Sequence, residues 1–419
     1  MNYKHTFPRI AFLALSVSLT TPAVADEYAV WLEPGEHIEN LTRDTDTEVV
    51  HASGFGLYHI VSRYERTSEE EQALLELLRK HAGTILAEGV VQSGGEEQCD
   101  EDGTQQCTIG FVDGTPTVGE YKRQDWIETL GILEGQALST TTPVVVAVID
   151  TGIDPRHPVF RGRLDSDGYD FIEERPGGWD LPNGTDDDGD RRVDEAYGHG
   201  THIAGTILAV NPHARILSLR VADAEGNATS YDVARAIEHA IAYGADVINL
   251  SLSFPEPSRI VAHTAHHAVS QGIAVVTSAG NTVQGPVLFP GSLDAKANTL
   301  FRLSGRNPSG VITVAACDDE SKLAWFSGRG AEVDLLIPGV DVYSAYPGDR
   351  WARWSGTSMA TAIGSGIVSL VVASDPLPGR PAQELVVQTA ALADEANPGI
   401  VTQIGWGIPN AERAVKAAR

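Results

Sequence analysis

Continuous apolar runs mark the chain from Thr142 onward. Each run ends in polar or small residues, and the runs are VVVAVID, ARILSLRV, DVINLSLS, GIAVVTSAGN and GVITVAAC. Because apolar and polar residues do not alternate in them, these runs predict strands that are buried on both faces, as in a parallel sheet. Two segments with helical spacing lie between them, YDVARAIEHAIAYG and RIVAHTAHHAVSQG. The pattern therefore predicts an α/β domain with a doubly wound, mostly parallel sheet flanked by helices.

The segment from Asp26 to about Val91 has a different pattern, in which short strand-like runs surround one helix. The helix is expected to open with Ser68, which has Glu71 in capping-box spacing. It carries four leucines on one broad face: Leu74, Leu75, Leu77 and Leu78. We predict a small α+β domain here. The stretch SGGEEQCDEDGTQQC that follows is typical of a flexible or disulfide-pinned loop near a domain boundary.

The first 25 residues have the pattern of a secretory signal. Lys4 and Arg9 precede the apolar run IAFLALSVSL, and Ala23-Val24-Ala25 follows it. A single N-terminal membrane anchor is the alternative, but the run is shorter than a membrane span requires. We expect cleavage after Ala25 and an exported protein, periplasmic or extracellular, with no membrane attachment in its mature form. The predicted organisation is a signal peptide over 1–25, an α+β domain over 26–120 and an α/β domain over 121–419.

The net charge indicates which partners are excluded, and the three cysteines are read together with the predicted export. The chain has 30 Lys and Arg against 57 Asp and Glu, a net charge of −27. Such an acidic surface repels nucleic acid and anionic membranes, so neither is expected as a partner. Export makes a disulfide between Cys99 and Cys107 feasible. Cys317 ends a strand-like run and is expected to be a buried thiol.

Three residue types that perform nucleophilic catalysis occur in the order Asp, His, Ser. Asp150 ends a predicted strand, His199 lies in YGHGTHIAG, and Ser358 lies in SGTSMATA. Each has an ordinary structural explanation when taken alone, as a cap, a core histidine or a loop hydroxyl. Their order excludes the α/β-hydrolase plan, which runs Ser, Asp, His and carries Gly-x-Ser-x-Gly. In doubly wound sheets the site lies at the carboxyl ends of the strands, where these residues are predicted to fall.

The blocks VAVIDTGID, GHGTHIAG, SAGN and SGTSMA, in that order, resemble the four sequence blocks of the subtilisin-like serine proteases, the subtilase family. The resemblance covers roughly Gln124 to the C-terminus. It implies a serine endopeptidase that cleaves peptide bonds through an acyl-enzyme, with Asp150, His199 and Ser358 as the triad. It also implies that Asn281 and the backbone N–H of Ser358 bind the oxyanion.

The resemblance implies further roles for neighbouring segments. An extended peptide or protein substrate is expected to pair with Ser251, Leu252 and Ser253. The family usually has glycine where Ser253 and Phe254 stand, so these larger side chains are expected to reshape the subsites. The nucleophile block continues into Ala362 and Ile363 in place of Pro-His, which predicts a more regular helix. Trp351 and Trp354 precede the nucleophile, either as hairpin packing or as rim contacts.

The N-terminal α+β domain is predicted to be a propeptide that assists folding, inhibits the enzyme and is then removed. This prediction rests on the arrangement of the segments, because the domain directly precedes the catalytic one and carries no family motif. Cleavage is expected between about Gly110 and Trp126. A stable N-terminal domain that is never cleaved is the alternative.

An acidic segment, NGTDDDGDRRVDE, precedes the histidine block. With Gly189 at the turn of a calcium loop, the predicted ligands are Asp186, Asp188, Asp190 and Glu195. The match is incomplete, because Gly184 occupies the first ligand place. A solvated acidic turn is therefore the alternative to structural calcium. Catalysis itself is expected to need no cofactor.

Two functions of other classes compete with the endopeptidase. A catalytically idle binding or scaffold protein on the same fold would lack a member of the triad or the oxyanion residue, and all four are present. An esterase would use the same triad, because acyl transfer to water is common to both reactions. We expect a monomer.

Overall fold

The computed structural model describes residues 27–33, 36, 38–53, 56–63, 66–81, 84–93, 110–111, 118–186, 192–293, 310–374 and 382–419. The predicted signal peptide and the proposed Cys99–Cys107 pair lie outside the described residues. The chain forms two compact units, which divide between Val90 and Val91 and are called here the N-terminal unit and the C-terminal unit.

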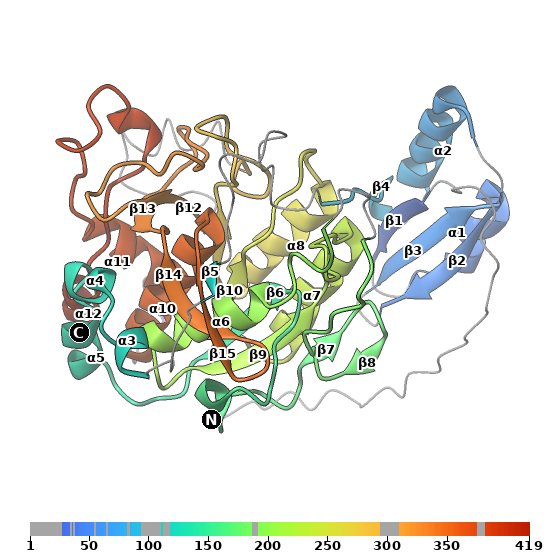
Figure 1. The fold of residues 1–419 in the computed structure, drawn as a ribbon. Helices are drawn as coiled ribbons and strands as arrows, with labels where there is room; N and C mark the ends of the chain where they lie inside the picture. The colour runs from blue at the N-terminus through green and yellow to red at the C-terminus, as the bar shows by residue number, and fades with distance from the viewer. Residues whose placement is uncertain are drawn as a thin grey trace, which may run out of the picture. The chain divides into compact units, whose positions relative to one another are not determined.

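The N-terminal unit is an antiparallel sheet with two helices, drawn in blue in Figure 1. Its strands lie in the order β2-β3-β1-β4. The elements are β1 (Glu27–Leu32), α1 (Ile38–Thr45), β2 (Thr47–Ala52), β3 (Leu57–Ser62), α2 (Ser68–Lys80) and β4 (Thr84–Gly89). Alternate residues of β1, Tyr28, Val30 and Leu32, join the unit's core cluster. The α+β prediction for this region is confirmed.

Helix α2 differs from its prediction at two places. Its N-cap is Thr67, whose hydroxyl accepts the Glu70 N–H while the Glu70 carboxylate accepts the Thr67 N–H. The predicted capping box of Ser68 and Glu71 is therefore wrong by one residue. Three of the four leucines are buried, but Leu77 is 48% exposed.

The C-terminal unit is built on an eight-stranded sheet in the order β13-β12-β11-β10-β6-β9-β7-β8. The strands are β6 (Val145–Asp150), β7 (Tyr169–Asp170), β8 (Arg175–Pro176), β9 (Arg215–Arg220), β10 (Val247–Leu250), β11 (Ala274–Ser278), β12 (Val311–Cys317) and β13 (Leu335–Pro338). All neighbours pair in parallel except β7 and β8. The chain adds β9 on one side of β6 and β10 to β13 on the other, so the predicted doubly wound sheet is confirmed.

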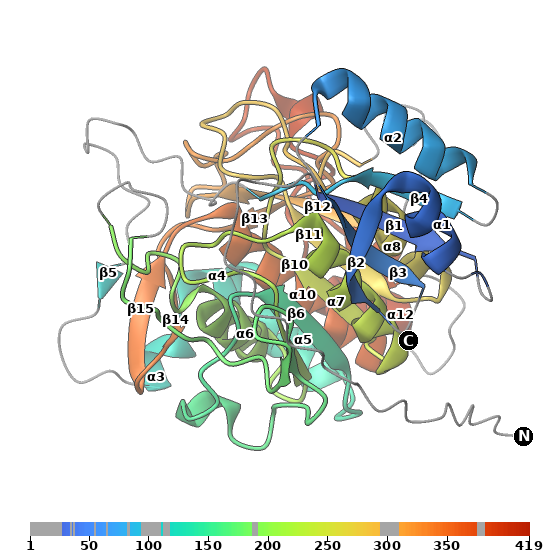
Figure 2. The same ribbon diagram turned by 90° about the vertical axis from the view of Figure 1, so that its right-hand side faces the viewer.

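Helices cover both faces of this sheet, as Figures 1 and 2 show. Val146 and Val148 of β6 belong to one core cluster, and Ala147 and Ile149 belong to the other. The first cluster includes residues of α4 (Asp125–Thr129), α5 (Ile132–Leu138), α6 (His199–Val210), α10 (Thr357–Ser374), α11 (Ala382–Gln388) and α12 (Ala411–Ala418). The second includes residues of α7 (Ser230–Ala242) and α8 (Arg259–Ser270). A strand buried on both faces explains the unbroken apolar runs.

A small antiparallel sheet precedes α10, with β14 (Val342–Tyr346) paired to β15 (Arg350–Trp354) and β15 paired to β5 (Gly110–Phe111). A short helix, α3 (Val118–Tyr121), follows β5 in the chain. Trp351 is buried in this hairpin and stacks on Tyr343, with ring centroids 5.5 Å apart. Hairpin packing therefore accounts for Trp351.

The segment Val91–Ser93 belongs to the C-terminal unit. Gln92 forms an antiparallel bridge with Thr229, and the Ser93 N–H donates to the carbonyl of Ala228 at 2.7 Å. The compact units thus divide upstream of the boundary predicted at residue 120. That the N-terminal segment is removed, and where the chain would be cut, both stay predictions.

Helix α10 passes the length and hydropathy test for a membrane span, and it is the one described helix that does so. Within that window 94% of the residues are buried inside the protein. It is therefore the central helix of a core. It runs unbroken through Ala362 and Ile363, as the absence of proline predicts.

Candidate active site

Asp150 and His199 meet where β6 ends and α6 begins. The Nδ1 of His199 lies 2.8 Å from Oδ1 of Asp150, and the Thr151 N–H donates to the same oxygen at 2.8 Å. The Asp150 side chain is buried. A carboxylate at Nδ1 fixes the imidazole tautomer with its proton on Nδ1, which leaves Nε2 as a proton acceptor.

Glycine at position 200 permits this approach. A Cβ atom added at Gly200 would lie 2.3 Å from the carbonyl oxygen of Gly152 and 3.0 Å from Oδ1 of Asp150. The Gly200 N–H donates to the Thr151 hydroxyl at 3.0 Å. The small residues of the block GHGTHIAG therefore let the start of α6 lie against the turn after Asp150.

Ser358 lies in the first turn of α10 and is 1% exposed. Its Oγ donates to the carbonyl of Ser251 at 3.4 Å, and the Ser251 hydroxyl donates to the carbonyl of Ser358 at 3.1 Å. Ser251 follows β10, so the structure brings this predicted substrate-edge residue into direct contact with Ser358.

Helices α6 and α10 pack against each other, and Trp354 connects the start of α6 to the segment just before α10. A Cβ atom added at Gly366 of α10 would lie 2.5 Å from Cβ of Val210 in α6. Trp354 precedes α10, and its ring meets the His199 ring edge to face, with centroids 5.2 Å apart. Trp354 is buried, so it packs against the imidazole and is not a rim residue.

Asn281 comes three residues after β11 and is held by the residue before Ser358. Its Oδ1 accepts both the N–H and the hydroxyl of Thr357, each at 3.1 Å. This leaves Nδ2 as the donor end of the amide. A Cβ atom added at Gly356 would lie 3.6 Å from Asn281 Nδ2 and 3.8 Å from the Ser358 nitrogen. The two predicted oxyanion donors therefore border one space, which glycine leaves open.

A second imidazole close to His199 adds no positive charge. His202 is fully buried, and its Nε2 lies 2.9 Å from the carbonyl of Val342. Burial and the neighbouring His199 lower the pKa of His202 to about 3. This imidazole is therefore neutral at neutral pH.

The residues that follow Ser251 are turned into the protein. Leu252, Ser253 and Phe254 are all buried, and the Phe254 N–H donates to the carbonyl of Phe289 at 2.7 Å. The Phe254 ring therefore packs in the core, and an effect of Ser253 and Phe254 on the subsites stays a prediction.

The acidic segment is only partly described, since Asp188 and Asp190 lie outside the described residues. The carboxylate of Asp194 accepts the N–H groups of Asn183 and Gly184, which joins the two ends of the loop. Among the described residues, no group of three or more His, Cys, Asp or Glu is arranged to hold a metal ion. The buried carboxylate of Glu225, which is 4% exposed, is a feature that fits a cation. Its Oε1 accepts the Asp194 N–H, and its buried Oε2 has no hydrogen-bond partner among the described atoms.

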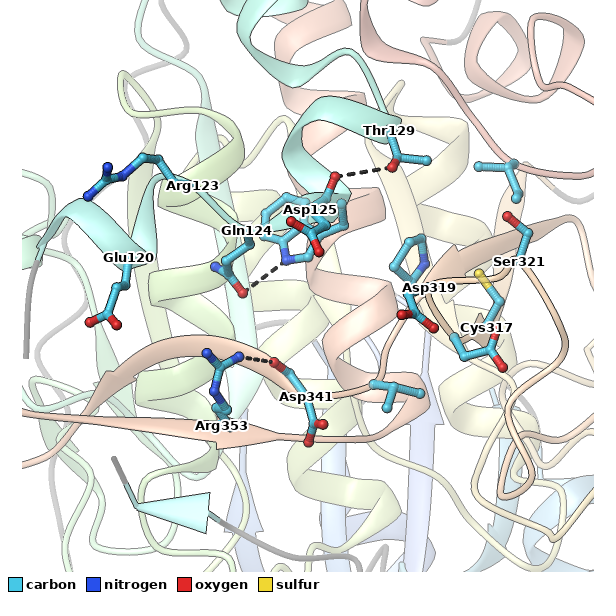
Figure 3. Close-up of a pocket in the computed structure, with 15 residues that line it drawn as sticks. Glu120, Arg123, Gln124, Asp125, Thr129, Cys317, Asp319, Ser321, Asp341 and Arg353 are labelled. Atoms are coloured by element: carbon cyan, nitrogen blue, oxygen red, sulfur yellow. Dashed lines mark hydrogen bonds between the residues drawn. The ribbon is translucent and has the colours of Figure 1, made fainter. Parts of the chain in front are cut away.

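A separate cavity of about 580 Å³ lies elsewhere in the C-terminal unit (Figure 3). Gln124, Asp341, Arg353 and Cys317 are among its lining residues, and none of the predicted triad is. The Arg353 guanidinium donates to the carbonyl of Asp341 at 3.1 Å. Cys317 is fully buried and burial raises the pKa of its thiol, so the prediction of a buried structural thiol is confirmed.

One buried carboxylate at the start of α6 was not predicted. Asp180 accepts hydrogen bonds from Gly198 and Thr201, on either side of His199. The only sequence signal for it is the glycine pair Gly177-Gly178 just upstream, which indicates close backbone approach.

Comparisons with known proteins agree on one family. The profile described as the subtilase family matches residues 141–407. Thermophilic serine proteinase of Bacillus sp. (strain AK1) is 33% identical over 280 residues, which cover 64% of this chain and 61% of that relative. Subtilisin Savinase of Lederbergia lenta is 32% identical over 246 residues, 57% of this chain and 79% of that relative. The chain thus spans about 61% of the length of the first of these relatives.

The solved structure of fervidolysin from Fervidobacterium pennivorans, a keratinolytic enzyme related to subtilisin, has a similar fold. The TM-score is 0.71 at 20% sequence identity, over 94% of this chain and 61% of that one. At this identity the likeness concerns the fold alone.

Proposed function

The chain belongs to the subtilase family, and from this premise we propose that it is a secreted serine endopeptidase with Ser358, His199 and Asp150 as its triad. The observation that carries the proposal is the 2.8 Å contact between His199 and Asp150 at the start of α6. Helix α6 packs on α10, which carries Ser358 in its first turn.

Each member of the triad has a distinct task. Ser358 Oγ attacks the peptide carbonyl, and His199 Nε2 takes its proton. Asp150 holds the imidazole tautomer and stabilises the imidazolium that forms. His199 then donates the proton to the leaving amine, and water hydrolyses the acyl-enzyme by the same route.

The oxyanion that forms on attack is bound by two donors, Asn281 Nδ2 and the Ser358 N–H. Thr357 supports this role because its two hydrogen bonds hold Asn281 Oδ1. Both donors are fixed before the reaction, so the protein does not reorganise when the charge develops.

The substrate is an extended peptide or protein segment that pairs with the main chain of Ser251, Leu252 and Ser253. The contact between Ser251 and Ser358 supports this placement, because it brings the start of the segment to the proposed nucleophile. Recognition through the main chain is compatible with many sequences, because main-chain hydrogen bonds do not distinguish side chains.

The N-terminal unit is a propeptide in this proposal, and the mature enzyme is a monomer. A core of its own supports independent folding of that unit. The extended segment Val91–Ser93 follows it directly and pairs with Ala228 and Thr229 of the C-terminal unit. An acidic loop with structural calcium on Asp186, Asp188, Asp190 and Glu195 completes the proposal, and the buried oxygen of Glu225 supports it. Calcium would neutralise the clustered carboxylates and has no step in catalysis.

One pair of proteins tests this function. Wild type and Ser358→Ala are incubated with a random peptide mixture, and the products are sequenced. Wild type is expected to cut peptide bonds and to yield a mature chain that starts between about Gly110 and Trp126. Ser358→Ala is expected to cut none and to keep its N-terminal unit. Peptide cleavage by the variant at the wild-type rate would refute the triad, whereas an active wild type that begins at Asp26 would refute only the propeptide.

A further inference from the structure

A buried carboxylate outside the proposed triad lies at the N-terminus of the helix that carries His199. Asp180 is 6% exposed. Its Oδ2 accepts the backbone N–H of Gly198 at 3.0 Å and the hydroxyl of Thr201 at 2.8 Å. Gly198 directly precedes His199, and Thr201 lies in the same helical turn. The two hydrogen bonds therefore bracket His199.

The N-terminus of α6 has no capping side chain of its own. Its N-cap is Gly198, with φ +95° and no side chain to accept a hydrogen bond. A Cβ atom added there would lie 2.4 Å from Cε2 of Tyr346, so the usual capping residues are excluded. The Gly200 N–H, which a capping side chain would bind, donates instead to the Thr151 hydroxyl at 3.0 Å, and Asp180 accepts the N–H of Gly198 itself.

The same two residues connect α6 to the turn that follows Asp150. The Asp180 N–H donates to the carbonyl of Ile153 at 3.2 Å, and the Thr201 hydroxyl accepts the Asp154 N–H at 3.0 Å. The approach is close, since a Cβ atom added at Gly152 would lie 2.6 Å from the carbonyl carbon of Trp179. Asp180 thus contacts residues close in sequence to Asp150 on one side and to His199 on the other.

We infer that Asp180 is a positioning residue for His199. It joins the first turn of α6 to the turn after β6, and this holds the imidazole at 2.8 Å from Asp150 while His199 exchanges a proton with Ser358. The inference rests on the proposed function, because it assigns a role in the same reaction. Asp180 acts through His199 and does not itself touch the substrate.

The hydrogen bonds of Asp180, and not its charge, perform this task. Burial raises the pKa of Asp180 well above its usual range, and nearby Asp150 adds to the rise, although Thr201, Gly198 and Arg220 oppose it. Both hydrogen bonds end on one oxygen, Oδ2. An amide oxygen accepts two hydrogen bonds equally well. Asparagine is therefore expected to replace Asp180, and alanine is not.

The test compares three variants of the full-length chain with wild type, and kcat and KM are measured on one peptide substrate. Asp180→Ala is expected to lower kcat by about 10- to 100-fold, because a small misplacement of a catalytic group has effects of this size. KM is expected to change by less than about threefold, since the substrate edge is untouched. Asp180→Asn is expected to restore kcat to within about threefold of wild type. The matched control is Asp246→Ala, which removes a carboxylate that accepts the Val145 N–H at the opposite end of β6 and leaves kcat unchanged.

Two variants of Thr201 keep the inference testable if Asp180→Ala fails to fold. Thr201→Ser keeps the hydroxyl that donates to Asp180, and Thr201→Val removes it at nearly constant volume. Only Thr201→Val is expected to lose kcat. Wild-type kcat in folded Asp180→Ala or Thr201→Val would overturn the inference, and so would a loss in Asp180→Asn as large as that in Asp180→Ala. A wild-type chain that cleaves no peptide would instead refute the proposed function.

Discussion

The two compact units build their sheets from opposite kinds of strand pairing. All strand pairs of the N-terminal unit are antiparallel, and its described core is one cluster between the sheet and its helices. In the C-terminal unit the central strands are parallel, and β6 contributes to a cluster on each face. Parallel strands bring segments that are distant in sequence to one edge. The candidate active site lies at such an edge, where Asp150 and His199 meet.

The N-terminal unit also has the smaller described core, so a single truncated core side chain is expected to destabilise it more than the C-terminal unit. Leu78→Ala is expected to destabilise that unit by about 2–5 kcal/mol, because Leu78 is fully buried in a small core. Hydrogen exchange in the Ser358→Ala chain, which is expected to keep the unit, measures the effect. The matched control is Leu77→Ala one residue away, where the exposed side chain predicts a change within about 0.5 kcal/mol. Equal effects of the two variants would contradict the assigned face of α2.

In the C-terminal unit, a substitution at the site is expected to affect the reaction more than the fold. Asn281→Ala removes one proposed oxyanion donor, and turnover is expected to fall by about 10²- to 10³-fold, a magnitude taken from subtilisin itself. The change is read as kcat of the variant, with the melting temperature as a control for folding. Unchanged kcat in a folded Asn281→Ala chain would remove Asn281 from the oxyanion site.

The sequence predicted the parallel sheet well because a strand buried on both faces leaves an unbroken apolar run, as in β6 and β12. The capping box of α2 was misplaced because Glu69, Glu70 and Glu71 are consecutive, so that Thr67 and Ser68 both have an acidic residue at the right spacing. Asp180 was missed because its contacts with Gly198 and Thr201 depend on a tertiary approach that no local spacing records. The burial of Phe254 was missed for the same reason.

The stabilities of the two units are also expected to depend differently on acid pH. The pKa of His202 is lowered to about 3 in the C-terminal unit, so its contribution to stability is complete above the unfolded value of about 6.5 and is lost as the pH falls toward 3. The slope for one such proton is about 1.4 kcal/mol per pH unit. In the N-terminal unit, the hydrogen bond from His59 lowers the pKa of Glu27, and this contribution is lost only below about pH 4.5.

Hydrogen exchange of the Ser358→Ala chain at pH 7 and pH 5 measures both units at once. The C-terminal unit of a His202→Gln chain should depend less on pH over this range, because it has no imidazole to protonate at that position. The same pH dependence in both chains would show that His202 is not the group responsible.

The smallest effect is expected from calcium, which concerns only one loop of the C-terminal unit. A cation that binds the folded loop stabilises it by mass action. Addition of a chelator is expected to lower the melting temperature of the C-terminal unit and to leave that of the N-terminal unit unchanged. Glu225→Gln should reduce the response, because it weakens the buried oxygen offered to the cation. A melting temperature that does not respond to chelator would identify the loop as an acidic turn without a metal.

The most direct test of the account is the reactivity of Ser358 toward a fluorophosphonate probe, followed by mass spectrometry of the labelled peptide. We predict that the probe modifies Ser358 in wild type and that His199→Ala suppresses the modification, because without the base the hydroxyl keeps its proton. Wild-type labelling at another serine, or labelling of Ser358 at an unchanged rate in His199→Ala, would contradict it.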